Sequence, residues 1–209
     1  MSASRRQFIL RRLHSFTGVF PIGVYLVFHI MLANASVLGG AASFDEAVQK
    51  IAGVPPAVLL GIEVAFIYLP LLFHGLYGFV RVREGNLETA VKQDWVGSYL
   101  YALQRLTGVI AFFFIVYHAA TTRGQHYFGH AEIGYAFMSR ALSNPLVFAW
   151  YVVGVLSSVF HFTNGLWTFC ITWGITVGER AQWWARTVSQ VLFGVMGATS
   201  IAILMAFRV

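Results

Sequence analysis

The chain has 209 residues, of which 58% are hydrophobic and 11% are charged, and its formal net charge is +6. A soluble domain carries about 25% charged residues, so this composition could not cover a water-facing surface without large apolar patches. The same numbers exclude a disordered chain, a collagen-like repeat and a disulfide-rich scaffold, because the sequence has one cysteine. The composition therefore indicates an integral membrane protein.

Five apolar segments are each long enough to cross a hydrocarbon core of about 30 Å as an α-helix. In chain order they cover residues 15–37, 56–80, 100–121, 145–173 and 188–207. These runs are much longer than the roughly ten residues of a membrane β-strand. Pro21 and Pro70 fall inside the first two segments and predict kinks there. We predict an all-α membrane fold with five transmembrane helices, in a single domain over residues 1–209.

The distribution of lysine and arginine predicts the orientation of the chain. If the N-terminus is cytoplasmic, ten of the 14 basic residues lie on that side and four on the other. The ten are Arg5, Arg6, Arg11, Arg12, Arg81, Arg83, Lys92, Arg105, Arg180 and Arg186; the four are Lys50, Arg123, Arg140 and Arg208. Because cytoplasmic loops carry the excess of basic residues, we expect the N-terminus inside and the C-terminus outside. The orientation of the chain in the membrane then accounts for the excess of basic residues, and a nucleic acid partner is not needed to explain it.

The first segment has an alternative interpretation as an export signal. Residues 4–10 resemble a twin-arginine motif, and Ala33-Asn34-Ala35 resembles a cleavage site. A second arginine pair follows, however, and the apolar run exceeds the about 7–15 residues of a signal core. Cleavage would also discard a helix that carries His29, so we interpret the segment as the first membrane helix.

An internal repeat relates the first two helices to the third and fourth. The first and third segments begin with Arg-Leu, pass a Thr-Gly-Val triplet and end on His29 and His118, which are 89 residues apart. The second and fourth contain His74 in FHGLYG and His161 in FHFTNGLW, 87 residues apart, each with a glycine four residues later. The fifth helix has no counterpart.

Four helices thus each carry one histidine within an apolar run. A lone histidine there could simply hydrogen-bond to a carbonyl, but four in register favour ligands, because ionisable groups in membrane spans usually mark functional sites. At about 1.5 Å per residue, His29 and His118 lie roughly 20–25 Å from the inner arginines, and His74 about 10 Å. His161 falls in the inner half of its helix. We therefore predict an outer pair, His29 with His118, and an inner pair, His74 with His161.

The chemistry of the pairs favours haem iron. Two imidazoles without a carboxylate or thiolate make a poor zinc site, whereas they suit a haem that is ligated on both faces. Four glycines would let a flat macrocycle approach the helices, although small residues also favour plain helix packing. They are Gly18, Gly78, Gly108 and Gly165. We predict a four-helix bundle around two stacked haem b groups, with the four histidines as metal ligands.

Further polar residues are candidates for binding the cofactor or moving protons. Those at the inner ends of the first and third helices could bind haem propionates, or could serve topology alone: Arg12, His14, Ser15, Gln104 and Arg105. Glu63 lies within the second helix, where a partly buried carboxyl group could relay protons or could be a merely hydrogen-bonded acid. Asp45 and Glu46, in the predicted outer loop, are the alternative donors. His126 and His130 have a metal-like i,i+4 spacing, but their polar loop favours surface histidines.

Several stretches together resemble a known family. RRLHSFTGV, IYLPLLFHGLYG, LQRLTGV and VGVLSSVFHFTNGLWTFCITWGITV resemble the cytochrome b membrane-anchor subunit of succinate:quinone oxidoreductase, in its single-chain, five-helix, two-haem type from bacteria that use menaquinone. The resemblance covers essentially the whole chain. It implies that His74 and His161 ligate the haem nearer the cytoplasm, and that His29 and His118 ligate the distal one.

The resemblance also implies a function in succinate dehydrogenase (complex II) and the tricarboxylic acid cycle, in the bacterial cytoplasmic membrane. Its partners would be a flavoprotein bearing FAD and an iron–sulfur subunit, in a complex that can form a higher oligomer. Electrons would pass from the iron–sulfur clusters through both haems to the quinone. This chain would carry electron transfer and quinone reaction, and the flavoprotein would oxidise succinate.

Two other functions fit the histidine pattern. One is the cytochrome b subunit of another quinone-linked enzyme, such as a hydrogenase or formate dehydrogenase; the FHFTNGLW stretch and the placement of one histidine on each of the first four helices favour the succinate family over it. The other is a haem-free, proton-coupled transporter that uses buried histidines as a proton relay. A haem b spectrum would exclude the transporter.

Overall fold

The structure is a computed structural model that describes residues 3–84, 96–129 and 131–208. All regular secondary structure in these ranges is helical. Five helical stretches are long and apolar enough to cross a membrane: Arg5–Gly39, Pro56–Glu84, Tyr99–Tyr127, Pro145–Thr172 and Glu179–Ala206. The prediction of an all-α membrane fold with five spanning helices is therefore confirmed.

The first three spans are interrupted helices. The first consists of α1 (Ala3–Val19), α2 (Ile22–Phe28), a π-helical turn η1 (His29–Ala33) and a 3₁₀ segment η2 (Asn34–Gly39). The second contains α4 (Pro56–Glu63), the π-helical η3 (Val64–Tyr68) and α5 (Leu69–Glu84), and the third contains α7 (Val96–Ala119), η4 (Ala120–Gly124) and α8 (Gln125–Tyr127). The break between α1 and α2 lies at Pro21, and η3 ends two residues before Pro70, so irregular backbone occurs beside both prolines.

The last two spans are the continuous helices α10 (Pro145–Thr172) and α11 (Glu179–Ala206). Several helices extend beyond the apolar runs in the sequence: the first begins at Ala3 rather than near residue 15, and the fifth at Glu179 rather than near 188. Hydropathy marks only the part of a helix that suits the hydrocarbon core, whereas backbone hydrogen bonding continues into the polar interface.

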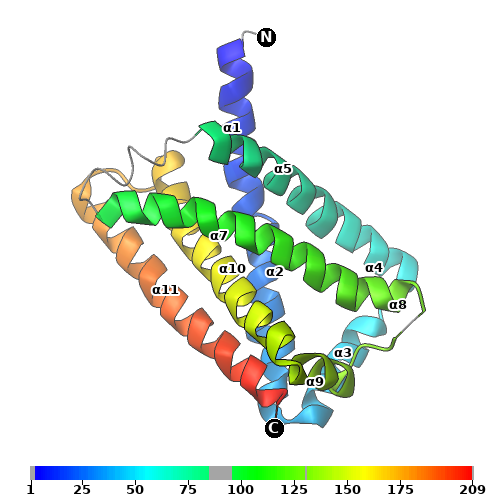
Figure 1. Ribbon diagram of the computed structural model, residues 1–209. Coiled ribbons are helices and arrows are strands. Elements are labelled where there is room, and N and C mark those ends of the chain that lie inside the picture. The colour runs from blue at the N-terminus through cyan, green and yellow to red at the C-terminus, as the bar shows by residue number, and fades with distance from the viewer. Residues whose placement is uncertain (1–2, 85–95, 130, 209) are drawn as a thin grey trace.

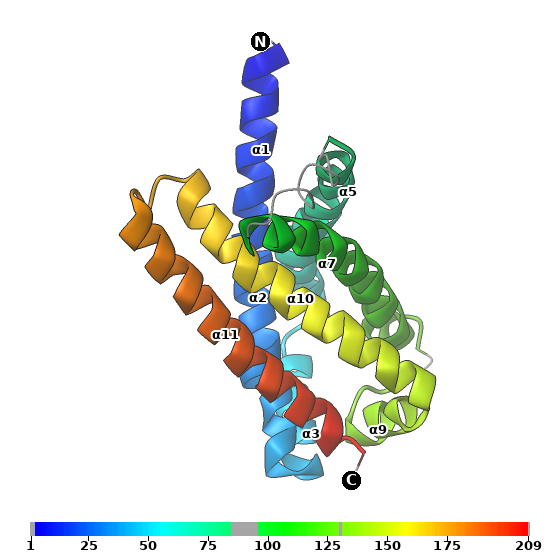
Figure 2. The ribbon, with the colours of Figure 1, turned by 60° about the vertical axis from the view of Figure 1, so that its left-hand side comes forward.

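Four spans form a closed ring (Figures 1 and 2). α1 packs against α5, α5 against α7, α7 against α10, and α10 against α1, while α11 packs on the outside of α10. The N-terminal part of α1, the end of α5, the start of α7, the end of α10 and the start of α11 lie at one end, which we call the inner end. The helices that the sequence singles out for their histidines are thus the four members of the ring.

Two short helices cover the opposite, outer end of the bundle. They are α3 (Ala41–Ala52) and α9 (Tyr135–Ser143). Phe44 of α3 packs edge-to-face on Phe207 at the end of α11, with ring centroids 4.9 Å apart, and Leu142 of α9 is fully buried. The sequence analysis treated this region as loop because neither helix contains a long apolar run.

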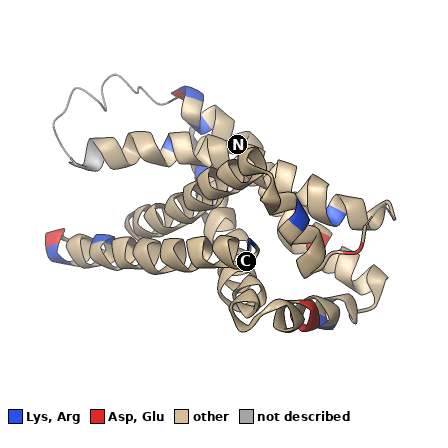
Figure 3. Ribbon diagram, turned by 60° about the horizontal axis from the view of Figure 1, so that its bottom comes forward, with Lys and Arg blue, Asp and Glu red and all other residues tan. Residues whose placement is uncertain are grey.

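The outside of the bundle suits a lipid environment. Large apolar side chains are widely exposed, for example Phe66 and Leu69 on the second span, and long stretches of helix carry no charged residue (Figure 3). Inside the bundle, buried Ser158, Thr163 and Ser200 donate hydrogen bonds to carbonyls of their own helices. Small side chains of this kind let membrane helices approach closely without leaving polar groups unpaired. The chain is thus a multi-pass membrane protein.

Candidate paired-histidine sites

The four histidines in the spans form two pairs. His74 of α5 and His161 of α10 have ring centroids 6.0 Å apart, with the ring planes at 83°. His29 and His118 have centroids 5.8 Å apart, with the planes at 69°. An imidazole nitrogen binds a metal at about 2 Å and the ring centre lies roughly 1 Å behind it, so two rings on opposite sides of one ion lie about 6 Å apart. Both pairs have the spacing of two axial ligands.

Each imidazole of the inner pair is held by a backbone carbonyl of another helix. His74 Nδ1 lies 2.9 Å from the carbonyl oxygen of His14, and His161 Nδ1 lies 2.9 Å from that of Gln104. Because a carbonyl oxygen can only accept, Nδ1 must carry the proton in both rings. Nε2 then keeps its lone pair for a metal, which is the usual arrangement of a ligating histidine and its supporting hydrogen bond.

The inner pair also shows the internal repeat in three dimensions. A Cβ added to Gly18 would lie 2.5 Å from His74 Cε1, and one added to Gly108 would lie 2.7 Å from His161 Cε1. Gly18 lies four residues after His14, whose carbonyl holds the ring of His74. Gly108 likewise lies four residues after Gln104, whose carbonyl holds the ring of His161. These contacts show that Gly18 and Gly108, which are 90 residues apart, occupy equivalent positions in the two repeats. Arg12 and Arg105 are 93 residues apart, so the two Arg-Leu pairs do not occupy equivalent positions.

The glycines beside the histidines contact side chains of this inner site. Gly18 and Gly108 make room for the imidazoles of His74 and His161. A Cβ at Gly78 would lie 3.5 Å from His14 Nε2, and one at Gly165 would lie 3.2 Å from Gln104 Nε2. Gly78 and Gly165 thus pack against the side chains of His14 and Gln104, which occupy corresponding positions in the two repeats.

The outer pair is supported by tyrosines instead of carbonyls. The hydroxyl of Tyr25 lies 3.3 Å from His29 Nδ1, and the hydroxyl of Tyr151 lies 3.2 Å from His118 Nδ1. π-Helical turns begin at His29 itself and two residues after His118, and such turns frequently occur at functional sites. The sequence analysis missed both tyrosines, because Tyr151 is 33 residues from its partner and neither tyrosine belongs to the repeat.

Unpartnered buried donors lie beside the inner pair. The ring of His14 stacks on that of His74, with centroids 4.1 Å apart, and its Nε2 is buried without a hydrogen-bond partner among the residues that the structure describes. The Nε of Arg105 is also buried without a partner, while its guanidinium lies over the ring of Tyr101. Buried polar groups normally have partners, so donors of this kind fit an anionic group such as a propionate.

The other propionate candidates differ in their contacts. Gln104 donates to the His161 carbonyl and accepts from Asn164, so its side chain braces α7 against α10. Arg12 lies over the rings of Phe8 and Trp173, and Ser15 is half-buried on α1. The described residues contain no group of three or more histidine, cysteine, aspartate or glutamate side chains suited to a metal ion.

Glu63 has partners that the sequence did not indicate. Its Oε1 accepts a hydrogen bond from Arg123 Nε at 2.8 Å, and its Oε2 accepts one from the Tyr127 hydroxyl. The carboxyl group is 12% exposed and the arginine side chain 25%. The turn η3, which begins at the residue after Glu63, contacts α2, the helix that carries Tyr25. The acid that the sequence singles out is thus half of an ion pair.

The remaining candidates lie at the outer surface. Asp45 is in α3 rather than in a loop, and its Oδ1 accepts from the backbone N–H of Tyr135, at the start of α9, at 2.6 Å. Glu46 pairs with Lys50 at 2.7 Å on the same helix. The Lys50 ammonium group lowers the pKa of Glu46 below its ordinary value, mainly through this hydrogen bond. His126 is exposed on α8, and His130 lies outside the described residues.

The contacts of Gly18 and Gly108 give a first prediction. Alanine at either position is expected to displace the imidazole that packs there and to lower occupancy of the inner metal site, while the outer site is retained. Haem b spectra of the purified G18A and G108A proteins check this. Gly194→Ala is the matched control, because a Cβ at Gly194 would meet nothing within 4 Å. Unchanged spectra in both variants would contradict the packing described here.

Comparison with known proteins gives two matches. The family model described as succinate dehydrogenase/fumarate reductase transmembrane subunit matches residues 86–203. The chain is also similar to the succinate dehydrogenase cytochrome b558 subunit of Bacillus subtilis (strain 168), with 36% identity over 205 residues that cover 98% of this chain and 99% of that protein. These matches confirm the resemblance that the sequence motifs indicated.

Proposed function

The chain belongs to the family of transmembrane subunits of succinate dehydrogenase and fumarate reductase, and we propose that it is a dihaem cytochrome b that passes electrons from an iron–sulfur partner to menaquinone. The observation that carries the proposal is the presence of two imidazole pairs, each with the spacing of axial ligands, within one helical ring. The similar Bacillus subtilis protein is itself named as a cytochrome b subunit, which supports haem as the cofactor.

In this proposal His74 and His161 hold the inner haem, and His29 and His118 hold the outer one. When bound there, each haem would supply a one-electron carrier. The carbonyls of His14 and Gln104 keep the inner imidazoles in the ligating tautomer, and the hydroxyls of Tyr25 and Tyr151 orient the outer ones.

The polar residues at the inner site would bind the propionates. His14 Nε2 and Arg105 Nε are the strongest candidates, because both are buried and lack partners. Arg12, Ser15 and Gln104 would add to this site from the same end of the bundle. Arginine suits the role because its guanidinium can form paired hydrogen bonds with a carboxylate.

We place quinone reaction near the outer site, with Glu63 as the proton donor. A second redox centre at the depth of His29 would serve no purpose if electrons left the chain at the first. Among the acids on this side, Asp45 and Glu46 lie on the short outer helix α3, outside the spans, whereas Glu63 lies within the second span and its side chain is only 12% exposed. Glu63 lies in a polar group with Arg123 and Tyr127, where a proton can be exchanged along hydrogen bonds.

The inner end would face the cytoplasm of a bacterium and bind the iron–sulfur subunit, with the flavoprotein beyond it. This orientation rests on the excess of arginine at that end. We predict that a cysteine at Arg180, at the inner end, cross-links to the iron–sulfur subunit in the assembled complex, whereas a cysteine at Lys50, in α3, does not. Both positions are exposed, so reactivity is matched. Cross-links from position 50 alone would reverse the topology.

Purification of the chain with its partners tests the proposed function. A reduced-minus-oxidised spectrum is expected to show haem b, and a flavoprotein and an iron–sulfur protein are expected to co-purify. A preparation without haem would favour the proton-coupled transporter. Haem together with hydrogenase or formate dehydrogenase subunits would favour the other class of quinone-linked enzyme.

A further inference from the structure

A groove lies outside the histidine ring, where α7, α10 and α11 meet. Its volume is about 180 Å³. It lies on a different side of α10 from the inner site. At 3.6 residues per turn, the average direction of Phe160, Asn164 and Trp167 around the helix axis differs by roughly 90° from that of His161. The groove therefore faces away from His161, and Asn164, which donates a hydrogen bond to Gln104, lies between the groove and the inner site.

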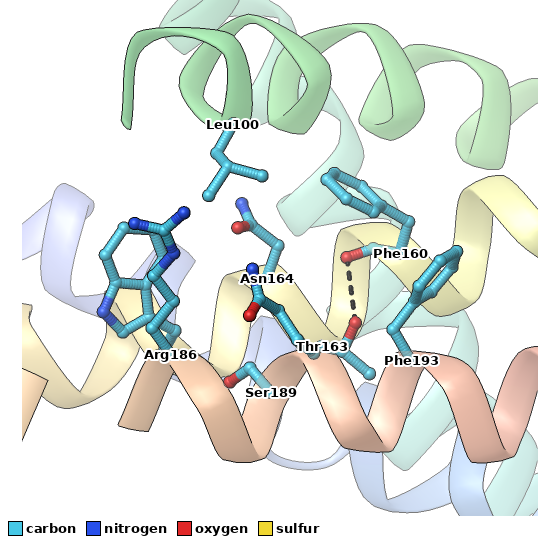
Figure 4. Close-up of a pocket in the computed structure, with 9 residues that line it drawn as sticks. Leu100, Phe160, Thr163, Asn164, Arg186, Ser189 and Phe193 are labelled. Carbon is cyan, nitrogen blue, oxygen red and sulfur yellow. Dashed lines mark hydrogen bonds between the residues drawn. The ribbon is translucent and has the colours of Figure 1, made fainter. Parts of the chain in front are cut away.

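The groove is polar at one end and apolar at the other (Figure 4). Arg186, Asn164 and Ser189 lie toward one end, and Phe160 and Phe193 toward the other. Arg186 is near the start of α11, at the inner end of the bundle, whereas Phe193 is two turns deeper in the span. The polar end thus lies near the membrane interface and the apolar end points toward the membrane centre.

The polar end contains groups that lack partners. The indole Nε1 of Trp167, which lines the groove, is buried and has no hydrogen-bond partner in the described part of the chain. The guanidinium of Arg186 lies over the same indole, 5.7 Å from its centroid, and forms no ion pair with a carboxylate of the described residues. A buried N–H left unpaired is costly, and a cation beside it favours an anionic ligand.

We propose that this groove binds an anionic phospholipid. The phosphate would accept hydrogen bonds from Arg186 and from Trp167 Nε1, and an acyl chain would pack along Phe160 and Phe193. The order of polar and apolar groups follows that of a lipid in the inner leaflet. Basic pockets between membrane helices on the cytoplasmic side are known to suit such headgroups.

The test uses the purified complex, delipidated in neutral detergent. Binding of dioleoylphosphatidylglycerol and dioleoylphosphatidylcholine is measured by native mass spectrometry and by the shift in melting temperature. Wild-type protein is expected to prefer phosphatidylglycerol. Arg186→Gln removes the charge and is expected to weaken that binding about fivefold to tenfold. Trp167→Phe removes the indole N–H but keeps an aromatic ring, and it is also expected to weaken binding. Arg186→Lys keeps the charge and is expected to retain most of the binding.

Arg140→Gln is the control, because it removes the same charge at an exposed position of α9 that lies outside the groove and away from the proposed partner face. Haem spectra unchanged from wild type verify that each variant is folded. Equal loss in the Arg140 and Arg186 variants would mean general surface attraction and would overturn the proposal, as would equal binding of the two lipids. Displacement of the lipid by a short-chain naphthoquinone, dependent on Arg186, would instead assign the groove to quinone.

Discussion

Replacing His74 or His161 with alanine is expected to remove one haem b spectral component, and replacing His29 or His118 is expected to remove the other. The reason is geometric, because each pair has the spacing of two ligands to one iron and the two pairs share no imidazole. Removal of even a supporting group typically lowers metal affinity about 10–100-fold, so loss of an axial ligand should empty its own site.

Low-temperature difference spectra of the four purified variants measure this effect. His126→Ala is the control, because that histidine is exposed on α8 and belongs to neither pair. Quinone-linked turnover is expected to fall at least a hundredfold in the four variants, while succinate oxidation with an artificial acceptor persists. Loss of the same component in H29A and H74A would show that the pairing is wrong.

Replacing Glu63 with glutamine is expected to slow quinone-linked turnover roughly a hundredfold, the scale of one positioned acid or base. Glutamine keeps the shape of the side chain but cannot deliver a proton. Both haem spectra and artificial-acceptor succinate oxidation should stay unchanged, because Glu63 contacts Arg123 and Tyr127 rather than a histidine.

Two further variants separate proton transfer from structure at this position. Glu63→Asp restores a carboxyl group and should recover part of the turnover, whereas a purely structural role would make it as poor as glutamine. Tyr127→Phe removes the hydroxyl that donates to Glu63 and accepts from Arg123, but it leaves the ion pair between these two residues, so we expect a smaller loss. Normal quinone turnover in E63Q would transfer the role to Asp45 or Glu46.

Much of the architecture follows from the sequence because it depends on local pattern. Apolar runs of about 20 residues reveal spanning helices by length alone, and the repeat places one histidine in each of four of them. The short outer helices α3 and α9 have no such run. α3 presents only Phe44 and Val48 to the core, a pattern too brief to distinguish from a polar loop.

The supporting contacts could not be found in the same way. The carbonyls that hold His74 and His161 belong to His14 and Gln104, which are 60 and 57 residues away, and a backbone carbonyl has no signature in the sequence. Arg123 is likewise 60 residues from Glu63. These contacts depend on how the helices cross, so they require the folded chain.

The haem content per chain shows whether the four histidines in the spans hold two haems. The complex purified from native membranes, with its soluble partners bound, is assayed for haem b and for this polypeptide. We predict two haem b groups per chain, both reducible by succinate. One haem per chain, or none, would contradict the assignment of His29, His74, His118 and His161 as two complete sets of axial ligands.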